Sequence, residues 1–276
     1  MEPRSHSSPE ITSATNSQVK WLRELNERRG REAAGAFLVE GPRAVEQALR
    51  SGARPLRVAY SPDLARSQPR VAAVVSAMPP EVPLLRLGER ALRSISDTVT
   101  AQGILAAFPM DSTPAIPHLD PSTALVLILD RIRDPGNVGT LLRSAAAAGA
   151  HAVLLSEGCA DPYSPKVVRS SAGGIFGVPF TTLGWPEIAA KVASLTHRYG
   201  ADARADVPYF EAELAEGCAI LVGNEAEGLG AEALHLSSGS LSIPIESGVE
   251  SLNAGVAGSL LLFEARRQRL SKARGA

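Results

Sequence analysis

The sequence predicts an α/β protein in two parts, a small α/β domain followed by a larger domain built on a parallel sheet. Its 276 residues allow about two domains at the usual ~150 residues each. Residues 109–123 are rich in proline and lack apolar periodicity, which is typical of a stiff linker between domains. After this linker, short apolar runs alternate with helical patterns, as in proteins whose parallel strands are buried on both faces.

The first part, residues 15–108, is predicted to alternate between helices and strands. Val19, Leu22 and Leu25 share one helix face. Pro42 begins a helix that Gly52 ends, because proline suits the first helical turn and glycine suits the residue after the last one. Further elements are strands at 37–39, 56–60, 82–87 and 103–108, and helices at 71–77 and 89–95. Residues 1–14 are expected to form a disordered extension.

The second part, residues 124–276, shows the stronger pattern. The run 125–129 is continuously apolar, as expected of a strand that is buried in a parallel sheet. A loop at 130–136 leads into an alanine-rich helix at 138–148. The remaining predicted elements are buried strands at 152–155, 219–222 and 241–245, and helices at 186–199 and 252–270. This alternation indicates a parallel α/β sheet.

The composition excludes several classes of protein. With 45% hydrophobic and 21% charged residues, the chain is not predominantly disordered, collagen-like or disulfide-rich. No apolar run approaches the roughly 20 residues of a membrane helix, and residues 1–10 lack the apolar core of a secretory signal. Cys159 and Cys218 stand alone, so a Cys-rich zinc site is not available. We therefore expect a cytoplasmic protein without a membrane partner.

The formal net charge of −1 hides an asymmetry between the two parts. Residues 1–110 carry a net charge of +4, and residues 111–276 carry −5. A basic first part suits nucleic acid, and an acidic second part suits a ligand of positive charge. On charge alone, two ordinary protein surfaces explain the difference equally well.

Three loops stand out because each follows a predicted strand, where open α/β sheets bind their ligands. The first is DPGNVG at 134–139, with Arg143 one turn into the next helix; the second is VGNEAEGL at 222–229; the third runs from 243 to 253. Each loop alone has an ordinary explanation. Gly-Asn turns and Ser251 suit helix caps, Gly223 suits a strand end, and Arg143 suits a surface ion pair.

The sequence also lacks the signatures of several enzyme classes. Residues 136–139, Gly-Asn-Val-Gly, have neither the third glycine nor the acidic residue of a dinucleotide fingerprint, which disfavours a nucleotide- or NAD-binding enzyme. There is no P-loop, no His-Glu-x-x-His and no Gly-x-Ser-x-Gly, and the five histidines are scattered. The groups left in the three loops are backbone donors, asparagines, an arginine and a glutamate. Such a set suits a reaction in which a cofactor supplies the chemistry and the protein positions the reactants.

Taken together, in this order and at these spacings, the three loops resemble the motifs of the SpoU-type branch of the SPOUT RNA methyltransferases. The matching stretches are DPGNVGTLLRSAAAAGA, LVGNEAEGL and SIPIESGVESLNAGVAGSLLLFEARRQR, within residues 124–270. Residues 17–108, including FLVEGPRAVEQAL, are similar to the substrate-binding domain often fused in front of that catalytic domain. The resemblance implies a SPOUT domain with a deep trefoil knot, preceded by a smaller, ribosomal-protein-like α/β domain that binds RNA.

The resemblance also implies an activity, a cofactor and partners. The activity is transfer of a methyl group from S-adenosylmethionine to a ribose 2′-hydroxyl of structured RNA, by a homodimer. Ribosomal RNA is favoured over transfer RNA, because members with this front domain commonly act there. The reaction needs no metal, since the sulfonium leaving group is already activated. Two alternatives stay open: a transfer-RNA 2′-O-methyltransferase, and an RNA-binding protein of the same fold that has lost catalysis.

Motif position assigns two groups of residues within this resemblance. The residues expected to hold the cofactor are Val222, Gly223, Ile243 and Leu252. We expect any side chain at Gly223 to occupy the volume of the ligand. The residues expected to line the reacting centre are Asn137, Arg143, Glu225, Ser251 and Asn253. Family members often have serine two residues after the third-motif asparagine, where this chain has Gly255.

The role of Arg143 has two interpretations. Its family counterpart is usually assigned as the base that accepts the hydroxyl proton, whereas a free guanidinium stays charged under ordinary conditions. On physical grounds we expect Arg143 to bind the neighbouring phosphate and to lower the pKa of the ribose hydroxyl.

Overall fold

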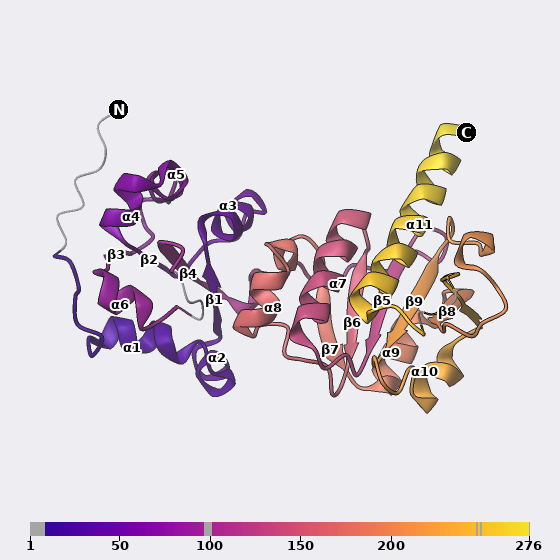
Figure 1. Cartoon of the computed structure of the whole chain (residues 1–276). Helices are drawn as coiled ribbons and strands as arrows, with labels where there is room; N and C mark the ends of the chain where they lie inside the picture. The colour runs from indigo at the N-terminus through magenta and orange to yellow at the C-terminus, as the bar shows by residue number, and fades with distance from the viewer. Residues whose placement is uncertain (1–8, 97–100, 247, 249, 276) are drawn as a thin grey trace. The chain divides into compact units, whose positions relative to one another are not determined.

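The structure, a computed structural model, describes residues 9–96, 101–246, 248 and 250–275 (Figure 1). It divides into two compact units. The first unit holds the described residues up to Ser112 together with Tyr163–Phe176, and the second holds Thr113–Pro162 and the residues from Gly177 onward. The chain therefore returns once to the first unit. The predicted domains, 15–108 and 124–276, do not contain this return, because the composition of 163–176 does not set it apart from its neighbours.

The first unit is a mixed four-stranded sheet with short helices, which confirms the predicted small α/β domain. The strand order is β1-β4-β2-β3, in which only the pair β2 and β3 is parallel. Helices α1 and α6 contribute apolar side chains to a shared core with this sheet. The elements are α1 (Ser17–Glu24), α2 (Arg28–Ala34), β1 (Ala36–Glu40), α3 (Pro42–Arg50), β2 (Arg57–Tyr60), α4 (Pro62–Ser67), α5 (Pro69–Ser76), β3 (Leu84–Arg86), α6 (Glu89–Arg93) and β4 (Ile104–Pro109).

Two details of this unit bear on the sequence predictions. Helix α3 begins at Pro42 as predicted, and Gly52, with φ +84°, follows its end in the left-handed region that suits glycine. In the extension predicted to be disordered, residues 9–14 are described, and the amide of Ile11 donates to Arg86 O at 2.9 Å. The prediction is therefore wrong for Ile11, and residues 1–8 lie outside the described residues.

The returning segment 163–176 is anchored in the first unit by aromatic packing. Helix α8 (Pro165–Ser170) packs against β1, and a 3₁₀ turn (Gly174–Phe176) ends the segment. The ring of Phe176 lies 5.0 Å from that of Phe108 and 5.7 Å from that of Phe37, centroid to centroid. The ring of Tyr163 is tilted against that of Phe37, with centroids 5.0 Å apart, and its hydroxyl donates to Met110 O at 3.0 Å. This segment is thus part of the core of the first unit.

The second unit is a six-stranded sheet of order β10-β8-β9-β5-β6-β7, and every pair in it is parallel. This confirms the predicted parallel α/β sheet. All six residues of β5, a central strand, are buried. The elements are β5 (Leu125–Asp130), α7 (Pro135–Ala148), β6 (Ala152–Ser156), β7 (Phe180–Leu183), α9 (Trp185–Val192), β8 (His197–Ala201), a 3₁₀ turn (Tyr209–Glu211), β9 (Cys218–Gly223), α10 (Ala231–Leu236), β10 (Gly239–Leu241) and α11 (Ala254–Gly275).

Three predictions for the second part are wrong in detail. The helix predicted at 186–199 ends at Val192, and residues 197–201 form strand β8. The strand predicted at 241–245 is β10, which ends at Leu241, because the backbone of Ser242 is hydrogen-bonded to residues 207 and 209 and no longer to β8. The second half of the predicted linker is not free, since Leu119 is buried and packs with Ile116 in the core of the second unit.

Helices α7 and α11 pack closely in this unit (Figure 1). A Cβ added at Gly258 would lie 2.5 Å from Cδ2 of Leu141, and the hydroxyls of Ser144 and Ser259 are 2.7 Å apart. Small residues on α11 therefore allow the two helices to approach. The trefoil knot stays a prediction. None of the described helices is long and apolar enough to cross a membrane.

The aromatic anchoring of segment 163–176 predicts the effect of Phe176→Ala. Phe176 is 3% exposed, so the change leaves a cavity in the first unit and should lower the free energy of unfolding by about 3–5 kcal/mol. Phe210→Ala is the matched control, because Phe210 is 51% exposed. Urea unfolding of both variants checks this. Equal losses in the two variants would contradict the anchoring role of the segment.

Candidate functional site

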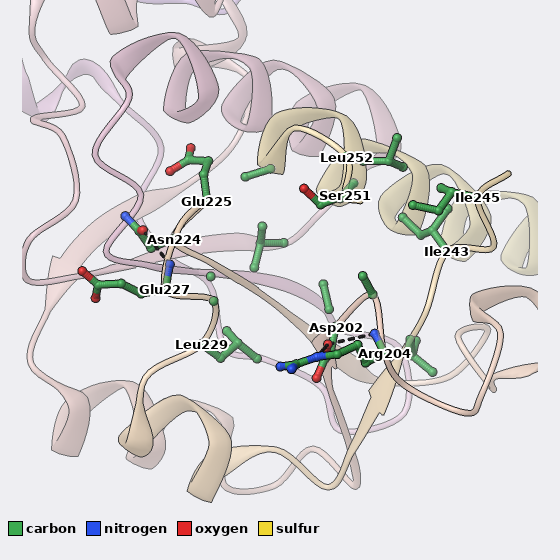
Figure 2. A pocket seen from close by; sticks show the side chains of 18 of the residues that line it. Asp202, Arg204, Asn224, Glu225, Glu227, Leu229, Ile243, Ile245, Ser251 and Leu252 are labelled. Carbon is green, nitrogen blue, oxygen red and sulfur yellow. Dashed lines mark hydrogen bonds and ion pairs between the residues drawn. The ribbon is translucent and has the colours of Figure 1, made fainter. Parts of the chain in front are cut away.

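A cavity of about 250 Å³ opens at the carboxyl ends of β8, β9 and β10 (Figure 2). Its lining comes from residues 201–204, 222–229, 241–245 and 251–257 and from Leu234 on α10. Figure 2 shows Ile243, Ile245 and Leu252 gathered on one side and the polar groups of residues 224, 225 and 227 on the other. An apolar slot with a few convergent polar groups is the usual form of a small-molecule site.

All four residues predicted to hold a cofactor line this cavity, namely Val222, Gly223, Ile243 and Leu252. Two residues predicted for the reacting centre, Glu225 and Ser251, line it as well. The structure therefore brings together the second and third sequence motifs, although they lie about one helix and one strand apart in the chain.

Asn137 and Asn253 lie beside the cavity. The side-chain amide of Asn137 donates to Oε1 of Glu225, which is part of the lining. A Cβ added at Gly255 would lie 3.1 Å from Oδ1 of Asn137 and 3.1 Å from Oδ1 of Asn253, so the two amides meet next to this glycine. Glycine at position 255 therefore leaves room for both amide groups.

The ends of two helices position these asparagines. Asp134 caps α7 by accepting the amide of Asn137 at 3.0 Å, and Asn253 caps α11 by accepting the amide of Val256 at 3.2 Å. The amino ends of α7 and α11 thus converge beside the cavity. Helix amino ends carry a partial positive charge, which favours negative charge that develops near them.

Arg143 is not part of this cluster. It is exposed on α7 and does not line the cavity. Within the part of the chain that the structure describes, its guanidinium has no hydrogen-bond or ion-pair partner. Its assignment to the reacting centre stays a prediction.

Asn224 shapes the loop that carries Glu225. Its Oδ1 accepts the amides of Ala226 at 3.0 Å and Glu227 at 3.2 Å, and its Nδ2 donates to Arg131 O at 3.0 Å. Asn224 is 8% exposed, so these partners satisfy a nearly buried amide. The loop after β9 is thereby joined to the residue that follows β5.

Asp130 and Arg131 hold the same loop through a second set of hydrogen bonds and ion pairs. The carboxylate of Asp130 is fully buried and accepts the amide of Gly230 at 2.6 Å and Nε of Arg131 at 3.2 Å. Nη1 of Arg131 donates to Oε2 of Glu227 at 2.6 Å. The hydrogen bond to Asp130, together with its charge, raises the pKa of the Arg131 guanidinium.

The structure gives a reason for glycine at position 223 that does not involve a ligand. A Cβ added there would lie 2.3 Å from the carbonyl carbon of Gly228 and 2.5 Å from the amide of Leu229. The expectation that a side chain there would occupy the volume of the ligand stays a prediction. Gly223 is needed because the loop folds back against the end of β9.

Sequence reasoning missed several residues that shape the site. Asp202 and Arg204 line the cavity after β8, which was predicted as helix and so offered no strand end to search. Leu229 and Leu234 add apolar lining. Arg131 gave no signal at all, because an arginine after a strand is unremarkable in sequence.

The arrangement suits a cofactor with an apolar ring and a polar, positively charged part. Apolar side chains line the slot, and Asp202, Glu225 and Glu227 lie around it. Among the described residues, there is no group of three or more His, Cys, Asp or Glu side chains that fits a metal ion. The asparagine cluster beside the cavity offers amide groups to a second, neighbouring ligand.

Comparison with protein families matches both parts of the chain. Residues 124–263 match the SpoU rRNA Methylase family, and residues 16–106 match the MRM3-like substrate binding domain. The chain is 32% identical to the 23S rRNA (guanosine(2553)-2′-O)-methyltransferase RlmP of Bacillus subtilis, over 93% of this chain and 99% of that protein.

Two solved structures share the fold over nearly the whole chain. A crystal structure of an RNA 2′-O ribose methyltransferase is 34% identical, with a TM-score of 0.82, and covers 95% of this chain and 100% of its own. An AdoMet-bound rRNA methyltransferase from Sinorhizobium meliloti is 27% identical, with a TM-score of 0.79, and covers 94% of this chain and 97% of its own.

The hydrogen bonds of Asn224 predict how its loop responds to substitution. Asn224→Ala removes the acceptor of two amides, so hydrogen exchange at Ala226 and Glu227 should become at least about tenfold faster. Asn224→Asp keeps the acceptor oxygen and should preserve protection at both amides. Exchange followed by NMR checks this. Equal protection in the alanine and aspartate variants would show that the side chain does not shape the loop.

Proposed function

Since the chain belongs to the SpoU rRNA methylase family, we propose that it transfers a methyl group from S-adenosylmethionine to a ribose 2′-hydroxyl of ribosomal RNA. The observation that carries the proposal is the contact between Asn137 and Glu225. It joins the first motif to the cavity built by the second and third motifs. A site for a small cofactor and a site for a second reactant therefore adjoin each other.

The residues of the cavity fit this cofactor. Ile243, Ile245 and Leu252 provide an apolar surface for an adenine ring, and the backbone at Val222 and Gly223 offers polar groups at its edge. The nearby carboxylate of Glu225 suits the positive charge of a sulfonium, whereas that of Glu227 is already paired with Arg131. When bound, S-adenosylmethionine supplies a methyl group on a leaving group that is already activated.

The asparagine cluster is proposed to orient the ribose. Glu225 holds the amide of Asn137, so that this side chain is fixed before RNA binds. The amino ends of α7 and α11 favour the negative charge that develops on the hydroxyl oxygen as its proton leaves. Positioning of the oxygen in line with the methyl carbon supplies much of the rate enhancement.

The first unit is proposed to bind the RNA. Residues 1–112 and 163–176 carry 17 Lys and Arg against 12 Asp and Glu, and the returning segment adds Lys166 and Arg169 without an acidic residue. Positive charge favours the RNA backbone, and only 4% of residues are aromatic. Recognition of folded RNA by shape and backbone is therefore favoured over stacking on single strands.

A homodimer is proposed from the exposed face of α11. Val256, Leu260 and Phe263 are 39–49% exposed although they are large and apolar, and their spacing of four and three residues places them on one helix face. A second copy of the chain would cover this stripe. Sedimentation of a monomer at micromolar concentration would count against it.

Methyl transfer is tested with labelled S-adenosylmethionine and, in separate reactions, deproteinised ribosomal RNA and transfer RNA. The expected product is a single 2′-O-methylated nucleotide, found by nuclease digestion. Asn137→Ala should lower the single-turnover rate by about 10²-fold while the cofactor affinity stays unchanged. Label in transfer RNA alone would favour the transfer-RNA alternative. Cofactor and RNA binding without any transfer would favour a protein that has lost catalysis.

The two interpretations of Arg143 predict different pH profiles. If the planar guanidinium of Arg143 binds the phosphate and the hydroxyl, Arg143→Lys should lower the rate by about 10²-fold. This loss corresponds to about 2.7 kcal/mol of activation free energy, and the pH profile should stay unchanged. Arg143→Ala should lose more, and cofactor affinity should stay constant in both variants. Single-turnover rates against pH check this. A wild-type rate that rises with an apparent pKa near 7 to 8, absent in the lysine variant, would instead identify Arg143 as the base.

A further inference from the structure

Arg131 has a backbone conformation that is rare for its residue type. Its φ is +52°, in the left-handed region, where arginine is disfavoured by its Cβ. Side chains from two other strand ends hold this conformation. The amide of Arg131 donates to Oγ of Ser156 at 3.0 Å, and its carbonyl accepts Nδ2 of Asn224 at 3.0 Å. Backbone strain kept at such a place often accompanies a functional constraint.

The side chain of Arg131 spans from the buried end of β5 to the loop at the cavity. Nε donates to the buried carboxylate of Asp130, and Nη1 donates to the half-exposed carboxylate of Glu227. Asp130 also accepts the amide of Gly230 at 2.6 Å. The loop is therefore fastened at two points, at Glu227 through Arg131 and at Gly230 through Asp130.

The fastened loop is the one that lines the cavity. Residues 223–225 and 227–229 all belong to the lining, and Glu225 also holds Asn137. Movement of Glu227 would shift Glu225, two residues earlier, and would change both the cavity wall and the orientation of the asparagine. The contacts of Arg131 thus lead to the site although its own side chain does not line the cavity.

We propose that Arg131 is a positioning residue, which keeps the loop of residues 224–230 in the conformation that binds the cofactor and orients Glu225. This inference rests on the proposed function for the identity of the cofactor. Arg131 acts through its ion pairs with Asp130 and Glu227. This role needs an arginine, because its planar guanidinium binds two carboxylates on different segments at once.

The test compares three variants of the full chain by calorimetric titration with S-adenosylmethionine. Glu227→Gln removes the outer ion pair and should raise Kd about two- to fivefold, with an unchanged melting temperature because this carboxylate is half exposed. Arg131→Lys keeps one charge but loses the fork, and should raise Kd about tenfold. Arg133→Ala is the matched control, since Arg133 is 66% exposed and lies 3.7 Å from the same Glu227. Its Kd should change less than about twofold.

Two further readouts separate positioning from a purely structural role. Hydrogen exchange at residues 226–230 should become faster in Glu227→Gln and Arg131→Lys, while exchange in β5 and β6 stays slow. The double variant should bind no more weakly than Arg131→Lys alone, because both changes break the same connection. Raised salt should narrow the difference in Kd between wild type and Glu227→Gln.

Unchanged cofactor affinity in Glu227→Gln and Arg131→Lys, beside a wild type that binds normally, would overturn this inference alone. A lowered melting temperature in Arg131→Lys with wild-type affinity would do the same, since it would make the role structural. Failure of the wild type to bind S-adenosylmethionine would overturn the proposed function and, with it, the cofactor that this inference names.

Discussion

The buried carboxylate of Asp130 is the feature on which the geometry of the site depends. A carboxylate without solvent requires a counter-charge and hydrogen-bond donors. Asp130 obtains them from Arg131, from the hydroxyl of Ser156 at the end of β6 and from the amide of Gly230 after β9. Three neighbouring strand ends are thus drawn to one point. The cavity lies beside that point because these contacts hold the loop from β9 to α10, which forms part of the cavity wall.

Much of the site was accessible from sequence because its residues follow strand ends. Val222 and Gly223 end a continuous apolar run, and Glu225 follows it two residues later; such a run predicts a buried strand with little ambiguity. Asn137 and Asn253 were assigned through the family resemblance, because an asparagine near a helix start is by itself more often a helix cap. The contact between Asn137 and Glu225 could not be predicted from the sequence, because the two residues are 88 positions apart in the chain.

The predictions that were wrong share a physical cause, which is that tertiary packing decided the outcome. Strand β8 has half-buried residues and a glycine, so its local pattern resembles the end of a helix more than a strand. Segment 163–176 packs in the first unit through Tyr163 and Phe176, whose partners are more than 50 residues away. The role of Arg131 depends on a positive φ and on two carboxylates from separate segments. The periodicity and composition of a sequence do not reveal contacts between residues that are distant in the chain.

The central claim is that one chain holds a cofactor and a ribose of ribosomal RNA in adjoining sites. The most direct measurement is a map of 2′-O-methylated positions in ribosomal RNA from cells with the gene, without it, and with the gene encoding Asn137→Ala. We expect one position to lose its methyl group in the deletion strain and to stay unmethylated in the strain that carries Asn137→Ala. An identical set of methylated positions in all three strains would contradict it.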